Sequence, residues 1–237
     1  MRPFVHLLIN DIRVLYRTGY IWASIAVFAL MLLVAVQASH LDFAGYERFV
    51  AAIILFDVVL SPVMLVGLLV LLERDEGGLA ILSVSPAPQH AYIAARVLVV
   101  SLIALAEMFI LVLAVYDGVL SPLQLASGLA AAACISALLG FLLVGFFDNL
   151  YAFMLPMIAT ILMLGAPGYG VLLGIDPAML AWHPTAGALA LIEGAFAGEA
   201  NYRFAQPILT TLLWIVIGSV TAHWAVRRMQ AQIGGAG

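Results

Sequence analysis

Long apolar stretches dominate the chain, and polar residues are concentrated in the short intervals between them. A transmembrane helix needs about 20 apolar residues to cross ~30 Å of hydrocarbon. Six stretches are of this kind, at roughly residues 21–38, 49–72, 92–115, 124–147, 150–174 and 208–226. Only Asp148 and Asn149 separate the fourth stretch from the fifth, which predicts a tight helical hairpin. The pattern therefore predicts an all-α integral membrane protein with six transmembrane helices.

The first 20 residues have a different, amphipathic pattern. Polar side chains recur at helical spacing on one face, at His6, Asn10, Arg13 and Arg17, and apolar ones share the opposite face, at Phe4, Leu8, Ile12 and Leu15. This pattern is typical of a helix that lies in the headgroup layer. We therefore divide the chain into an interface helix, residues 1–20, and a transmembrane domain, residues 21–237. Asp11 falls on the apolar face, so we expect it either to pair with an arginine of a neighbouring segment or to turn toward water.

Two intervals between the predicted spans differ from simple turns. The loop 73–91 opens with four charged residues in a row, from Glu73 to Glu76, followed by Gly77 and Gly78. A short loop with charges of both signs is suited to binding a soluble partner, although such a loop can also be merely solvated. The interval 175–207 is long and largely apolar, which predicts short re-entrant helices that dip into the membrane before the last span.

Composition supports lipid as the surrounding solvent. The chain is 65% apolar and only 9% charged, whereas soluble domains have about 45–50% apolar and ~25% charged residues. Its net charge of −4 argues against a nucleic-acid partner, because no basic surface is available to neutralise phosphates. Cys134 is the only cysteine, so no disulfide can form within the chain.

The sequence contains no motif for catalysis or nucleotide binding. The stretch Gly165–Gly170 is rich in glycine but lacks the Lys-Ser/Thr ending of a phosphate-binding loop. The five histidines are scattered along the chain rather than paired. We therefore expect that the chain is not an enzyme and binds no cofactor of its own.

The arginines predict the orientation in the membrane. With a cytoplasmic N-terminus, seven of them fall inside, at positions 2, 13, 17, 74, 96, 227 and 228, and two fall outside, at positions 48 and 203. This distribution follows the positive-inside rule. Both termini and the charged loop are therefore expected on the cytoplasmic side.

The charged loop also carries a family resemblance. Its pattern is Glu73-Arg74-Asp75-Glu76-Gly77-x-Leu79-x-x-Leu82-x-x-Ser85-Pro86. Together with the order of the predicted helices, this pattern resembles the permeases of type-2 ATP-binding-cassette (ABC) exporters, and among them most closely the fluoroquinolone-type drug exporters. Gly78 replaces the usual Thr or Ser and Ala80 a frequent acidic residue, so the helix in the loop is expected to be less well capped.

The resemblance implies a function and a set of partners. The loop would form a coupling helix that docks on a separate ABC ATPase, which would bind the ATP and Mg²⁺. Leu79 and Leu82 would provide an apolar anchor, and the charged residues before them would form the rim. A second permease copy or paralogue would complete a dimer in the bacterial inner membrane, and the complex would export an amphipathic drug or lipid-like molecule.

Two acidic residues are expected at membrane depth. Asp57 and Glu107 each lie about eight residues from the outer end of their span, which places both roughly 12 Å below the outer surface at 1.5 Å per residue. They are expected to line a substrate pathway for a cationic molecule, or to share a proton. The alternative is that each is a structural group bonded to a nearby Ser or backbone carbonyl.

Two other functions remain open on the sequence alone. One is a haem-exporter B-like subunit of cytochrome c maturation, for which His40 and His183 are the candidate residues on the outer side. The other is a proton-coupled carrier that uses Asp57 and Glu107 without an ATPase. A carrier has no need of a charged docking loop, and the spans show no obvious internal repeat.

Overall fold

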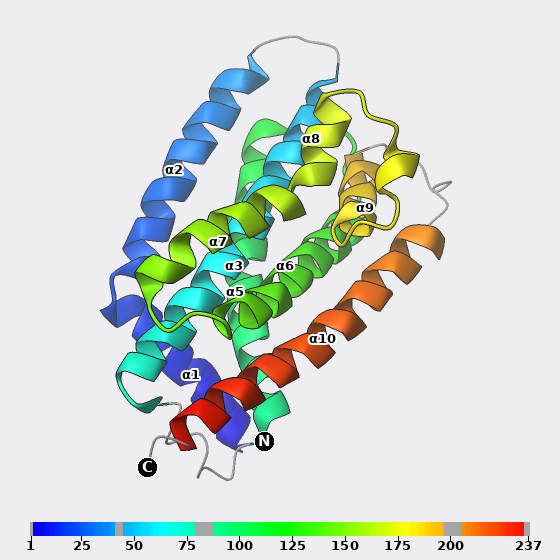
Figure 1. Ribbon diagram of the computed structural model, residues 1–237. Helices are drawn as coiled ribbons and strands as arrows, with labels where there is room; N and C mark the ends of the chain where they lie inside the picture. Colours follow the sequence, from blue (N-terminus) through cyan, green and yellow to red (C-terminus); the bar gives the residue numbers. More distant parts are fainter. Residues whose placement is uncertain (1, 41–44, 79–87, 197–204, 235–237) are drawn as a thin grey trace.

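The computed structural model describes residues 2–40, 45–78, 88–196 and 205–234, and within these ranges every regular element is helical (Figure 1). The elements in chain order are α1 (Arg2–Arg17), α2 (Tyr20–Ser39), α3 (Tyr46–Asp75), α5 (Gln89–Val115), α6 (Pro122–Val144), α7 (Leu150–Leu164), α8 (Ala166–Leu172), the short 3-10 helix η1 (Pro177–Leu180), α9 (Ala186–Phe196) and α10 (Ala205–Gly234).

The predicted fold class is confirmed. Five helices, α2, α3, α5, α6 and α10, are long and apolar enough to cross a membrane. The fifth predicted span is divided into α7 and α8, which meet at a bend of 48° at Gly165. Pro167 explains the bend, because it cannot donate the backbone hydrogen bond of a continuous helix and its ring would clash with the preceding turn. If α7 and α8 are taken together as one bent span, the described residues contain six spans.

The core of the bundle is formed by α3 and α6, which pack closely against each other. Gly140 of α6 allows this approach, because a Cβ added there would lie 3.3 Å from the backbone of Val63. Gly128 of α6 likewise allows α9 to approach closely, because a Cβ added at Gly128 would lie 3.0 Å from the carbonyl oxygen of Ala188. Small residues at helix contacts are the usual means of close packing in membranes.

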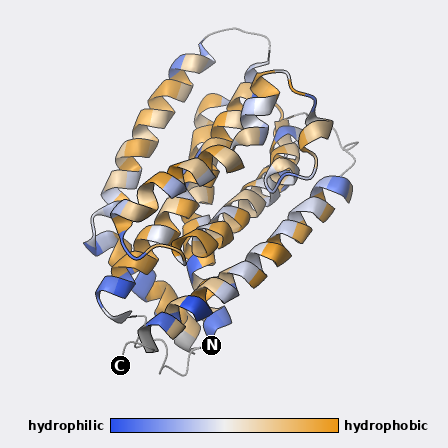
Figure 2. Ribbon diagram, in the orientation of Figure 1, coloured by the Kyte–Doolittle hydropathy of each residue, from blue (hydrophilic) through white to orange (hydrophobic). Residues whose placement is uncertain are grey.

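The outer helices expose apolar side chains over their length. On α2, Trp22, Leu30 and Leu33 are each about 60% exposed, and on α10 Leu209 and Val220 are similarly exposed. Figure 2 shows apolar residues along the middle of the helices and polar residues gathered toward their ends. Such a continuous apolar surface fits a protein surrounded by lipid.

The two ends of the bundle differ. Helix α1, the end of α3, the start of α5 and the end of α10 lie together at the lower end in Figure 1, and α8 and α9 lie at the opposite end. Helix α1 packs on α5 through Asp11 and Leu15, both buried, and exposes the apolar side chains of Val5, Ile9 and Ile12. Helix α9 is too short to span a membrane and is largely buried against α6 and α10.

Candidate functional site

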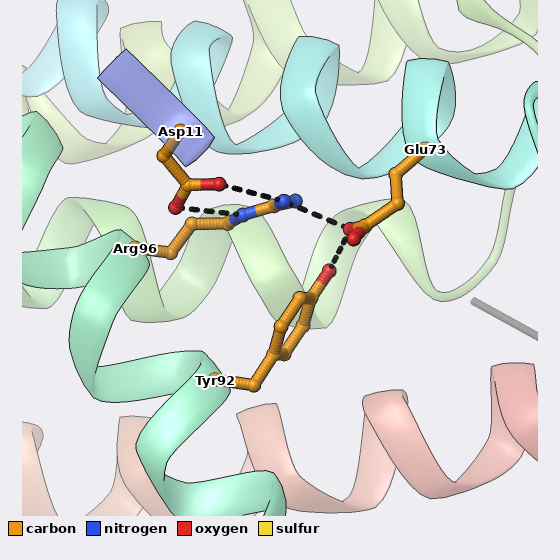
Figure 3. A network of polar contacts seen from close by, with 4 residues as sticks. All are labelled: Asp11, Glu73, Tyr92 and Arg96. Carbon is orange, nitrogen blue, oxygen red and sulfur yellow. Dashed lines mark hydrogen bonds and ion pairs between the residues drawn. The ribbon is translucent and has the colours of Figure 1, made fainter. Parts of the chain in front are cut away.

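A buried ion network joins three helices at the polar end of the bundle (Figure 3). Its centre is Arg96 of α5, whose side chain is only 3% exposed. The guanidinium donates from Nε to Oδ2 of Asp11, at 3.3 Å, and from Nη2 to Oδ1, at 3.1 Å. Nη2 also lies 2.8 Å from Oε2 of Glu73, at the end of α3. One arginine therefore holds carboxylates from α1 and α3 on α5.

Tyr92 completes the network. Its hydroxyl donates to Oε2 of Glu73 at 2.7 Å, and the guanidinium carbon of Arg96 lies 4.7 Å from the centre of its ring. The two residues are four positions apart on α5, which places them on one face of the helix. The ring of Tyr92 also contacts Phe141 of α6 edge-on, with centroids 6.0 Å apart. The network is thus supported by the core on its inner side.

The buried charges of this network hold α1, α3 and α5 in one relative arrangement. Burial raises the pKa of the Asp11 carboxyl, and the neighbouring Arg96 guanidinium opposes that rise. Removing one member of a buried pair leaves an uncompensated charge, which costs about 3–5 kcal/mol. The Asp11, Glu73 and Arg96 side chains therefore strongly favour a single arrangement of α1, α3 and α5.

Two further ion pairs tie the last turn of α3 to its surroundings. Arg74 lies 2.7 Å from Asp148 and donates to the backbone oxygen of Phe147 at 3.3 Å, which links α3 to the turn between α6 and α7. Glu76 accepts a hydrogen bond from Arg17 at 2.9 Å, on the exposed surface beside α1. The end of α3 is therefore connected to α1, to α5 and to the α6–α7 turn.

The predicted coupling residues fall into four groups. Glu73 and Arg74 point into contacts within the bundle, whereas Asp75 and Glu76 remain exposed. Gly77 has a φ of +75°, the left-handed conformation that commonly terminates a helix. Leu79, Leu82, Ser85 and Pro86 lie outside the described residues, so their role as an anchor stays a prediction.

The sequence did not identify Tyr92 or Arg96 as functional residues. The signal that pointed to the network was Asp11, whose position on the apolar face of α1 required a partner. The structure decides between the two expectations for Asp11, since it is 3% exposed and paired with Arg96. Tyr92 and Arg96 are four positions apart and therefore share one face of α5. This spacing indicates a polar site only when it is known that Glu73 faces them, which the structure shows.

The structure brings the two intramembrane carboxyls into one cavity. Asp57 of α3 and Glu107 of α5 line a space of about 60 Å³ beside α2. The hydroxyl of Ser24 on α2 donates to Oε1 of Glu107. Ligand sites for drug-sized molecules have volumes of about 300–1,000 Å³. In this conformation the cavity is thus too small for a drug, and a role in the substrate pathway stays a prediction.

A larger hollow lies at the opposite end of the bundle from the ion network. It has a volume of about 620 Å³ and is bordered by α8, η1, α9 and α10. Most of its lining is apolar, with Glu193 and Thr210 among its few polar residues. Burial raises the pKa of Glu193, and the charge of Arg48 opposes that rise. The sequence pattern gave no indication of this hollow.

The two candidate haem-binding histidines occupy different environments. His40 follows the end of α2 and is exposed, whereas His183 is half-buried in the turn before α9. Nδ1 of His183 lies 3.2 Å from the Thr185 hydroxyl and 3.4 Å from its backbone nitrogen. Burial lowers the pKa of His183, and the backbone of Met163 opposes that fall. These contacts are those of a residue that stabilises its own turn.

The helical bundle, its exposed apolar surface and its polar end are those of a multi-pass membrane protein. A family model described as "Fluoroquinolones export permease protein Rv2686c-like" matches residues 13–152, which is more than half of the chain. The chain belongs to this family, as the charged loop indicated. No curated protein matches the chain. Membership supports a transport subunit for export rather than an enzyme.

Proposed function

We propose that this chain is the permease subunit of an ATP-driven ABC exporter that moves an amphipathic small molecule, such as a drug or lipid-like compound, out of the cytoplasm. Membership of a drug-export permease family is the observation that carries the proposal. The chain contains no nucleotide-binding motif, so ATP and Mg²⁺ would be bound by separate ATPase subunits.

The arrangement at the end of α3 supports a coupling role. Asp75 and Glu76 are exposed where α3 ends. Immediately before them, Glu73 and Arg74 are tied to α5 and to the α6–α7 turn. A displacement applied at this point by a docked ATPase would therefore be passed to several helices at once. Exposed charges suit the rim of such a docking surface, where they set register and association rate.

The polar end of the bundle is the proposed cytoplasmic side. Contacts join five arginines to the end of α3, the start of α5 and the α6–α7 turn, namely Arg17, Arg74, Arg96, Arg227 and Arg228. Arg48 lies in the first turn of α3, at the opposite end of that helix. By the positive-inside rule, both termini would lie in the cytoplasm and the 620 Å³ hollow would lie on the outer side. For a bacterial exporter the membrane would be the inner membrane.

A second permease copy or a paralogue is part of the proposal. The exposed apolar faces of α2 and α10 leave room for a partner within the membrane. A substrate path between two permeases would explain why the intramembrane cavity within one chain has only about 60 Å³.

The proposal is tested by isolating the complex. The tagged chain is solubilised from its native membranes in mild detergent, and co-purifying proteins are identified by mass spectrometry and assayed for ATP hydrolysis. We expect an ABC ATPase that hydrolyses ATP and is lost when Asp75 and Glu76 are both replaced by Arg. A purified, transport-competent preparation without any ATPase would overturn the proposal.

A further inference from the structure

The small cavity between α2, α3 and α5 has the chemistry of a binding site. Its polar lining consists of two carboxyls, Asp57 and Glu107, and three hydroxyl groups, those of Tyr20, Ser24 and Ser61. The other lining residues are apolar, and all come from the same three helices. Five oxygen-bearing side chains thus converge within a bundle that is otherwise strongly apolar (Figure 2).

The two carboxyls lack a basic partner in this cavity. No Arg or His among the described residues lines it, and the other titratable side chain that the structure shows in its walls is Tyr20. Two neighbouring carboxylates at membrane depth repel each other and are both poorly solvated. At least one of the two charges must therefore be neutralised, either by a proton or by a bound cation.

One buried polar atom in the cavity has no partner. Asp57 is 5% exposed, and among the described residues its Oδ2 has no hydrogen-bond partner. The hydroxyl of Ser61, which is 6% exposed, interacts with the Tyr20 side chain. Buried polar groups in native structures are nearly always satisfied, by protein, water or a ligand. The free oxygen of Asp57 therefore indicates an occupant of the cavity.

The size and the hydrogen bonds of the cavity limit that occupant. A volume of about 60 Å³ admits a few water molecules, since one water requires about 10–15 Å³ measured in this way. The Ser24 hydroxyl is hydrogen-bonded to Glu107, and the described residues contain no group of three or more His, Cys, Asp or Glu side chains that could hold a metal ion. A proton with accompanying water fits these constraints.

We propose that Asp57 and Glu107 form an intramembrane proton-binding site that holds one exchangeable proton between them. Ser24 and Ser61 provide the polar surroundings for the carboxyl that carries the charge. Since Ser24 lies near the start of α2, loss or gain of the proton changes the hydrogen bond that attaches this end of α2 to α5. This site is independent of the proposed ATPase-docking surface.

The test uses the purified full-length protein in liposomes and dicyclohexylcarbodiimide, an apolar reagent that modifies protonated carboxyl groups. Labelling is followed by intact-mass and peptide mass spectrometry across a pH series. Within the cavity we expect one label per chain, on Asp57 or on Glu107 but never on both in one molecule. Labelling should decline as the pH rises and disappear in the double variant Asp57→Asn/Glu107→Gln.

Matched controls make the result specific. Glu193→Gln removes a half-buried carboxyl elsewhere in the molecule and should leave the label at the cavity unchanged. Infrared difference spectra of unlabelled protein provide a second measurement, because the C=O stretch of a buried protonated acid should be present in the wild type and absent in the double variant. No ATPase is needed, so this test can fail while the proposed export function stands.

Three outcomes would overturn the proposal. The first is labelling that persists in the double variant, and the second is simultaneous labelling of Asp57 and Glu107. The third is saturable protection by Na⁺ but not by choline, which would identify a metal cation as the occupant in place of the proton.

Discussion

At the scale of single residues, Arg96 is the most constrained side chain of the polar end. It bridges Asp11 and Glu73, lies over the ring of Tyr92, and is almost fully buried. A guanidinium can hold two carboxylates at once because its donors are arranged in a planar fork. An ammonium group at the same position would carry the charge without this geometry.

Replacing Arg96 by Leu should lower the free energy of unfolding by about 3–5 kcal/mol, because Asp11 would be left buried without its partner. Glu73 would lose its ion pair but keep the hydrogen bond from Tyr92. Arg96→Lys should be less damaging. Arg17→Leu is the control, since the exposed pair of Arg17 with Glu76 should contribute less than about 1 kcal/mol. Denaturant unfolding in detergent measures all three. Equal effects of Arg96→Leu and Arg17→Leu would contradict the structural role of the network.

His183 gives a pH-dependent prediction. Burial lowers its pKa in the fold, so between the folded pKa and about 6.5 the unfolded chain binds more protons than the folded chain. Stability should therefore fall as the pH drops below about 6.5. His183→Asn, which retains an acceptor for the backbone of Thr185, should reduce this acid-dependent loss. Thermal unfolding over a pH series measures it, and an identical pH dependence in both proteins would refute the assignment.

At the scale of helices, the apolar pattern predicted where the long elements lie but not how they are joined. The six predicted stretches correspond to α2, α3, α5, α6, the α7–α8 pair and α10. The break at Gly165 was missed because Pro167 occurs within an uninterrupted apolar run. The ion network was missed for a different reason, since Asp11 and Arg96 are 85 positions apart and only the tertiary packing of α1 on α5 brings them together.

The crossing of α9 and α10 depends on a glycine. A Cβ at Gly187 would lie 2.4 Å from the carbonyl oxygen of Pro207, and a backbone atom cannot yield as a side chain can. Gly187→Ala should therefore separate α9 from α10 and destabilise the protein by roughly 1–3 kcal/mol. Gly168→Ala is the matched control, since its Cβ would lie 3.5 Å from Ala52, an ordinary contact. Thermal unfolding compares the two, and equal tolerance would show that α10 is not held this closely.

At the scale of the whole molecule, the charged residues define one polar end that is proposed to be cytoplasmic. In a Cys134→Ala background, Asp75→Cys and Asp117→Cys introduce single exposed thiols near opposite ends of the bundle. A membrane-impermeant maleimide should label Asp117→Cys in intact cells and Asp75→Cys only after the cells are opened. The reverse pattern would show that the charged end lies outside the cell, where a cytoplasmic ATPase could not bind it.

On the proposed function, an ATPase acts on this protein at the exposed end of α3. The difficulty in testing Glu76 is its internal pair with Arg17, because a loss of function on mutation could reflect either contact. A charge swap separates them. Glu76→Arg removes both the internal pair and the docking charge, whereas Arg17→Glu/Glu76→Arg restores the internal pair with its sign reversed.

The most direct measurement is therefore substrate-stimulated ATP hydrolysis by the complex reconstituted in liposomes, with wild type, Glu76→Arg and Arg17→Glu/Glu76→Arg compared at equal amounts of inserted permease. We predict that stimulation is lost in the single variant and stays lost in the charge swap, because the partner still meets the wrong charge. Full stimulation in the single variant, or its recovery in the charge swap, would contradict docking at Glu76.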